Sequence, residues 1–141
     1  MADTMQFDLV APERKLVSGK ATSVRVPGAE GDMTAMPDHA PVIATLRPGV
    51  LVAEMENGTE EFAVFGGFAE IGPEGTSVLA EEAFPVSEVN AEVLNPRIER
   101  AREAQENAPE DAKGTAAKFL ADLVAMGDQI GISTQSRAPS P

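Results

Sequence analysis

Residues 28–51, GAEGDMTAMPDHAPVIATLRPGVL, decide the fold of this chain. Among short apolar pieces they set six residues that bend or restrict the backbone: Gly28, Gly31, Pro37, Pro41, Pro48 and Gly49. Glycine adopts positive φ without steric cost, and proline fixes φ and removes an N–H donor. A segment that bends this often, with few charges between bends, is expected to form a shaped surface of loops between strands. It also holds His39, the only histidine of the chain.

Short segments with alternating apolar residues lie on both sides of this stretch and predict strands. They cover 5–10, 21–26, 50–55, 61–65, 68–71 and 76–80. Asn57-Gly58 predicts a β-hairpin with a type I′ turn, which needs positive φ at both central residues. Gly66-Gly67 is expected to separate two strands. Short strands with turns about every ten residues are typical of a β-sandwich or a flattened barrel.

The composition changes near Pro85, after which Ala and Glu, both good helix formers, become frequent. Asn95-Pro96 is the pattern of a capping residue followed by a proline in the first turn, so a helix is expected over 97–106. A second helix is expected over 110–126, because its larger apolar residues form one stripe with Phe119 and Met126 at the margin. The carboxy-terminal part is therefore predicted to be an α-helical hairpin.

Three segments follow from this pattern. We expect a β-sandwich domain over 1–86, a helical hairpin over 87–134 and a disordered tail over 135–141. The first of the two helices offers little apolar surface for burial, so the hairpin is expected to be the less stable unit.

The charge of the chain excludes several classes of function. The net charge is −12, and residues 58–84 carry six glutamates with no Lys or Arg, which argues against nucleic-acid binding. This acidic region is either a solubilising face or a docking surface for a basic partner. The chain has no cysteine, no signal-peptide pattern and no apolar run long enough to span a bilayer, so no direct membrane insertion is expected.

An active site is not evident in the sequence. Asp32, Asp38 and His39 come nearest to a metal-binding pattern, but one histidine is fewer than such sites normally use. A hydrogen-bonded loop residue or an interface residue is the simpler interpretation of His39. Nucleophilic triads, converging carboxylates and phosphate-binding loops are also missing. We therefore expect a non-catalytic binding or coupling role with no cofactor.

Four groups of residues resemble the epsilon subunit of the bacterial F-type ATP synthase, a family similar also to the mitochondrial delta subunit. The first group is Phe7 to Glu13, and the second is Ser18-Gly19 followed by Val24 to Val26, which match the family's second hairpin. The most specific group places GxEGD at 28–32, PxHAP at 37–41 and RPG at 47–49, in the family's order and spacing. The fourth holds Glu61-Phe62, Gly66-Gly67-Phe68-Ala69-Glu70 and Val78-Leu79-Ala80. The likeness covers about residues 5–84 well and the rest in outline.

This resemblance implies a fold and a function. The fold would be a ten-stranded sandwich followed by a helical hairpin. The function would be that of a rotor subunit on the central stalk, which links the gamma subunit to the c-ring and couples proton flow to ATP synthesis. The hairpin would reach the alpha and beta subunits when extended and modulate ATP hydrolysis. The protein would be located at the cytoplasmic face of the bacterial inner membrane, as a peripheral part of the complex.

The resemblance also implies contact residues. Glu30, Gly31 and Asp32 would meet the polar loops of the c-ring, and Asp32 is in addition a natural turn-forming side chain. His39, Ala40, Pro41 and Val42 would form a largely apolar ledge for gamma. Some members bind ATP through an Ile/Leu-Asp-x-x-Arg-Ala motif, but here Asn90 and Val93 replace the acid and the arginine. Arg100 and Arg102 remain as weak nucleotide candidates, and no tight ATP site is expected.

Two other functions remain open on the sequence alone. One is a stand-alone β-sandwich binding module with a helical tail, which would bind a small ligand and not gamma. The other is a metalloenzyme built around His39, which metal analysis of chelator-free protein would reveal.

Overall fold

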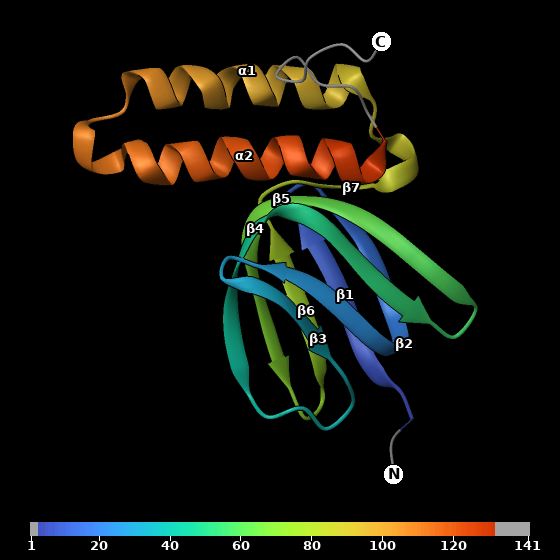
Figure 1. Cartoon of the computed structure of the whole chain (residues 1–141). Coiled ribbons are helices and arrows are strands. Elements are labelled where there is room, and N and C mark those ends of the chain that lie inside the picture. The colour runs from blue at the N-terminus through green and yellow to red at the C-terminus, as the bar shows by residue number, and fades with distance from the viewer. Residues whose placement is uncertain (1–2, 132–141) are drawn as a thin grey trace. The chain divides into compact units, whose positions relative to one another are not determined.

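The computed structural model describes residues 3–131 (Figure 1). The chain divides into two compact units, of which the first ends at Ser87 and the second begins at Glu88. The first unit holds all of the strands, and the second holds the two long helices. The tail predicted at 135–141 lies outside the described residues.

The first unit is a closed, flattened β-sandwich, as predicted. Its strands are β1 (Met5–Ala11), β2 (Arg14–Gly28), β3 (Gly31–Ala35), β4 (Val42–Met55), β5 (Gly58–Gly72), β6 (Gly75–Ala80) and β7 (Ala83–Pro85). They follow the order β1-β6-β5-β4-β2-β3, and an additional β1–β2 pairing closes the sheet. All pairings are antiparallel except the parallel pair β1–β6. Closure removes most of the exposed strand edges.

Three strands are long enough to take part in both faces of the sandwich. β2, β4 and β5 each have 14 or 15 residues. β2 pairs with β1 from Arg14 to Ala21 and with β3 from Val24 to Gly28, and its pairing with β4 shifts register between Ala21 and Ser23, where this change of neighbour occurs. Counting the halves of these three strands separately turns the seven strands into the ten that the resemblance implies.

Gly66 and Gly67 lie inside β5, so the prediction that they separate two strands is wrong. Their φ angles are 110° and 118°, and a Cβ on Gly67 would lie 2.1 Å from the carbonyl oxygen of Leu79. The core side chain alternation changes phase across them, from Phe62 and Val64 before to Ala69 and Ile71 after. The pairing with β4 keeps the same register on both sides of the two glycines, so they change the course of β5 and do not end it.

The segment 28–51 also contains more strand than its sequence predicts. It holds the end of β2, all of β3 and most of β4, and its loops are limited to Ala29 with Glu30 and to 36–41. Pro48 is buried within β4, opposite Phe65 of β5. Partners distant in sequence stabilise these strands, so local proline and glycine content is a poor guide here.

The β4–β5 hairpin forms where Asn57-Gly58 predicts it, but the turn type is different. Met55 pairs with Gly58, so Glu56 and Asn57 form the two-residue connection. Only Gly58 has positive φ, at 135°, and Asn57 does not. A type I′ turn needs positive φ at both central residues, so that part of the prediction is wrong.

The hydrophobic core lies between the two faces of the sandwich. Every strand contributes to it, and the largest fully buried side chains in this unit include Phe7, Leu9 and Leu51. All members of this core cluster lie between Met5 and Ala83. The sandwich therefore has a complete core of its own, as an independent domain requires.

The second unit is the predicted helical hairpin, but its first helix starts earlier than expected. α1 spans Ala91–Asn107 and follows a short 3₁₀ turn, η1 (Val86–Glu88). Asn90, not Asn95, is the N-cap, and its side chain accepts a hydrogen bond of 3.1 Å from the N–H of Val93. Pro96 consequently lies inside the helix. Burial of Leu94 and Ile98, one turn apart, favours the earlier start, because a helix beginning at Arg97 would not contain Leu94.

The second helix is shifted toward the carboxy terminus. A 3₁₀ turn, η2 (Glu110–Ala112), precedes α2, which spans Lys113–Ile130 and ends at Gly131 in the left-handed conformation. Leu123 is buried as predicted, and Met126, predicted to be marginal, is also fully buried. Lys113 donates to the carbonyl oxygens of Gln105 and Glu106 at 3.2 and 3.3 Å, which satisfies the end of α1.

Candidate functional site

The turn between β2 and β3 carries the three residues that the resemblance assigns to the c-ring. Gly28 pairs with Gly31, so Ala29 and Glu30 form the tip. A Cβ on Gly28 would lie 2.6 Å from the carbonyl oxygen of Gly31, and Gly31 itself has a φ of 140°. Only glycine fits both positions, which explains why the GxEGD motif produces this tight turn.

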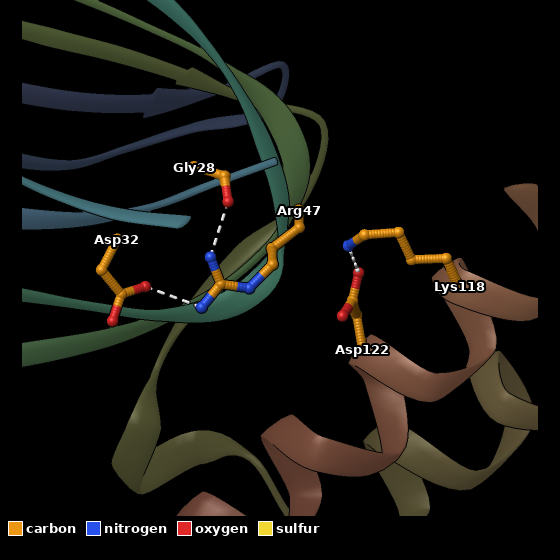
Figure 2. Close-up of polar contacts among 5 residues, drawn as sticks. All are labelled: Gly28, Asp32, Arg47, Lys118 and Asp122. Carbon is orange, nitrogen blue, oxygen red and sulfur yellow. Dashed lines mark hydrogen bonds and ion pairs between the residues drawn. The ribbon is translucent and has the colours of Figure 1, made fainter. Parts of the chain in front are cut away.

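Arg47 fastens this turn to β4 (Figure 2). Its Nη1 donates to the carbonyl oxygen of Gly28 at 2.6 Å, and its Nη2 donates to Asp32 Oδ1 at 2.7 Å. The N–H of Ala29 also donates to the carbonyl oxygen of Thr45 at 2.7 Å. The turn is therefore held against β4 by three hydrogen bonds, two of which come from one guanidinium group.

The tip of the turn presents negative charge to solvent. Glu30, Gly31 and Asp32 are all exposed, and the Asp32 side chain is 53% exposed. Glu30 makes no hydrogen bond or ion pair with any residue between 3 and 131. Beside the tip, an open concavity of about 470 Å³ lies between the turn and the start of β4, from Val42 to Thr45. The arrangement offers an acidic, accessible and well-anchored contact point.

The connection between β3 and β4 holds the second set of predicted contact residues. The N–H of His39 donates to the carbonyl oxygen of Met36 at 3.2 Å, and Asp38 adopts a φ of 66°. Proline at the second position and a left-handed residue at the third are typical of a type II turn. His39 Nδ1 lies 2.6 Å from the carbonyl oxygen of Ala40, which only accepts, so Nδ1 carries the hydrogen.

The four predicted gamma-contact residues differ in exposure. Ala40 and Pro41 are exposed, and His39 and Val42 are half-buried. Within residues 3–131, no three His, Cys, Asp or Glu side chains gather closely enough to hold a metal ion. Asp32, one member of the metal pattern considered above, accepts a hydrogen bond from Arg47 instead.

Sequence reasoning missed three exposed apolar residues on the outer face of the sandwich. Ile43 on β4, Phe68 on β5 and Leu79 on β6 are 70%, 40% and 42% exposed. Phe68 and Leu79 are direct cross-strand partners, and Ile43 lies diagonally from Phe68 because Thr45 is the residue opposite Phe68. The signal was available, because strand alternation directs all three away from core residues such as Leu46, Ala69 and Val78.

The two weak nucleotide candidates do not form a paired site. Arg100 and Arg102 both lie on α1, two residues apart, which separates their side chains by about 200° around the helix. Arg102 is engaged in an ion pair with Glu99. On α2, Lys118 and Asp122 form a similar local pair at 2.8 Å (Figure 2).

None of the helices between residues 3 and 131 has both the length and the apolar character that a membrane crossing requires.

Comparison with known proteins identifies the family. The family model of the ATP synthase delta/epsilon chain β-sandwich domain matches residues 4–86. The ATP synthase epsilon chain of Ruegeria sp. (strain TM1040) is 53% identical over 137 residues, covering 94% of this chain and 100% of that relative. The ATP synthase epsilon chain of Paracoccus denitrificans is 51% identical over 140 residues, covering 94% of each chain.

Solved structures agree on the fold. A chain of the Euglena gracilis mitochondrial ATP synthase, solved with its c-ring, aligns with a TM-score of 0.71 at 20% identity and covers 92% of this chain and 82% of its own length. A chain of the Tetrahymena thermophila mitochondrial ATP synthase central stalk and c-ring aligns with a TM-score of 0.66 at 16% identity, covering 89% and 94%. Together with the identities of the curated relatives, these findings mean that the chain belongs to the ATP synthase delta/epsilon chain family.

Proposed function

We propose that this chain is a non-catalytic rotor subunit of a proton-driven F-type ATP synthase. It binds the gamma subunit and the polar loops of the c-ring, and it transmits rotation between them so that proton flow drives ATP synthesis. Its place is the cytoplasmic face of the bacterial inner membrane, as a peripheral part of the complex. The match to two ATP synthase epsilon chains covers 94% or more of each relative's own length, which supports this assignment.

The observation that carries the proposal is the exposed apolar face of the sandwich. Ile43, Phe68 and Leu79 form a strip across three adjacent strands. Ile43 lies two residues after Pro41, an exposed residue of the ledge, and Val42 between them packs against the core. A contiguous exposed apolar patch on a soluble domain is typical of a protein–protein interface. We assign the ledge and the strip together to gamma.

The acidic turn suits the second partner. Glu30 and Asp32 are exposed on a rigid tip, and a rigid charged tip is suited to the basic side chains of another protein's loops. A contact that transmits torque gains from a turn that does not deform, and the three hydrogen bonds to β4 supply that rigidity. We assign Glu30, Gly31 and Asp32 to the c-ring.

The helical hairpin has a regulatory part in this proposal. Its contacts with alpha and beta, when extended, would modulate ATP hydrolysis. Arg100 and Arg102 do not converge, so we expect weak nucleotide binding by the hairpin at most.

Co-purification tests the assignment. A tagged full-length chain expressed in its own cell is expected to bring down gamma together with the alpha and beta subunits. Ile43→Glu should weaken gamma binding by about tenfold or more, because it places a charge in an apolar contact. Asn57→Glu is the matched control, since it adds the same charge at the exposed β4–β5 hairpin. Recovery of the alpha and beta subunits without this chain would contradict the proposal.

A further inference from the structure

One guanidinium group spans the whole β2–β3 turn. Arg47 reaches the carbonyl oxygen of Gly28, where the turn begins, and the carboxylate of Asp32, just after the turn ends (Figure 2). The Arg47 side chain is 27% exposed, so its donors are partly shielded from water. Arg47 itself lies in β4 between Leu46 and Pro48, which pair with Gly67 and Phe65 of β5. β4 and the turn are therefore linked through one side chain.

This linkage contributes more to position than to stability. The carboxylate partner is more than half exposed, and ion pairs of this kind stabilise a fold only slightly. Two hydrogen bonds in a planar fork nevertheless fix both ends of the turn relative to each other. The local geometry of the turn is thus expected to depend on Arg47 more than the overall fold does.

The two carboxylates of the turn differ in their hydrogen-bond partners. Asp32 has one oxygen engaged by Arg47, whereas Glu30, at the tip, makes no polar contact with any residue in the described part of the chain. Sequence reasoning treated both as contacts for a partner. The geometry separates them, because only Glu30 has its full hydrogen-bonding capacity available.

We infer that Arg47 is the positioning residue of this turn: its two N–H donors fix the loop so that Glu30 meets the Lys or Arg of a basic partner loop, and Asp32 acts through Arg47. The inference rests on the proposed function, in which that partner is the c-ring. It predicts that partner binding requires a guanidinium group, with its two parallel N–H donors, at position 47. Lysine keeps the charge but is a single ammonium group, and it does not reproduce two parallel donors at fixed spacing.

The test compares matched substitutions in the full-length chain. Glu30→Gln and Asp32→Asn each remove one negative charge and keep the shape, so long-range electrostatic effects on binding are nearly equal. Asn at position 32 retains an oxygen that accepts from Arg47, whereas alanine does not. The affinity of each variant is measured for a purified ATP synthase, c-ring included, from which this chain has been removed.

The expected order of affinities is specific. Glu30→Gln, Arg47→Lys and Asp32→Ala should each weaken binding about tenfold, the scale of one lost charged contact, and Asp32→Asn should stay close to wild type. The double variant Arg47→Lys/Asp32→Ala should bind no more weakly than the weaker-binding single variant, because both substitutions disrupt the same hydrogen bonds of Arg47. Melting temperatures should fall by less than about 8 °C, which shows that the fold is retained.

Several results would overturn the inference. Equal losses in Glu30→Gln and Asp32→Asn would mean that Asp32 contacts the partner directly. Wild-type affinity in Arg47→Lys would mean that charge at position 47 is sufficient without the fork. Failure of the wild-type chain to bind the complex at all is a distinct outcome, because it rejects the proposed function and with it the partner.

Discussion

Gly28 shows how one residue determines the acidic turn. Its pairing with Gly31 brings the two backbones so close that a Cβ would lie 2.6 Å from a carbonyl oxygen. The motif residues of the turn were recognisable in the sequence, since glycine is the residue that such close approach requires. The role of Arg47 was not, because nothing in the spacing of 28 and 47 says that a side chain from β4 reaches back to the turn.

Gly28→Ala is expected to destabilise the sandwich by about 1–3 kcal/mol, the usual cost of forcing an extra methyl group into a packed site. Chemical denaturation of the full-length chain measures this. Gly72→Ala is the matched control, because a Cβ there would meet nothing within 4 Å, and a change below about 0.5 kcal/mol is expected. Equal stability of the two variants would show that the turn yields easily and is not the rigid element described here.

At the scale of elements, α1 shows a conflict between local sequence and helix. Pro96 removes the N–H that would donate to the carbonyl oxygen of Glu92, and Asn95 before it is disfavoured in helical conformation. Asn95 Oδ1 is also buried without a hydrogen-bond partner in residues 3–131. The helix forms nonetheless, because Asn90 caps it and Leu94 and Ile98 are buried. The dipeptide Asn95-Pro96 has the local pattern of a helix start. The prediction based on it is wrong because the cap at Asn90 and the burial of Leu94 place the start earlier.

Pro96→Ala is therefore expected to stabilise α1 by up to about 3 kcal/mol, the helix-interior penalty of proline. Amide hydrogen exchange of residues 91–100 should slow, while exchange in the strands stays unchanged. Pro109→Ala serves as the control, because Pro109 follows a residue in extended conformation outside both α-helices. Unchanged or faster exchange in α1 after Pro96→Ala would contradict this account of the helix.

At the scale of the molecule, the fold class was predictable and the strand boundaries were not. Alternation in segments such as 5–10 and 76–80 identified β1 and β6, since each has one face in the core. The first half of β4 and all of β3 were not predicted, because these strands are stabilised by β5 and β2, their partners in the sheet. The exposed strip of Ile43, Phe68 and Leu79 became visible only once register placed these residues on one face.

The core makes a prediction about truncation. All of its members lie between Met5 and Ala83. Phe65 also packs edge-to-face on Phe84 of the same unit, with 6.0 Å between the ring centroids. A chain that ends after Ser87 is thus expected to keep the sandwich folded and able to bind gamma. Cooperative thermal unfolding followed by circular dichroism measures the first property, and co-elution with gamma measures the second. Loss of cooperative unfolding would make the hairpin part of the sandwich's own folding unit.

The most direct measurement is proton-driven ATP synthesis in inverted membrane vesicles from cells that lack the native copy of this chain. We expect synthesis to be restored by the full-length chain and by Asn57→Glu, and to stay at least about tenfold lower with Ile43→Glu, which disrupts the apolar strip. If vesicles without the chain synthesise ATP as fast as vesicles that contain it, the chain does not couple the rotor to proton flow, and the central claim is wrong.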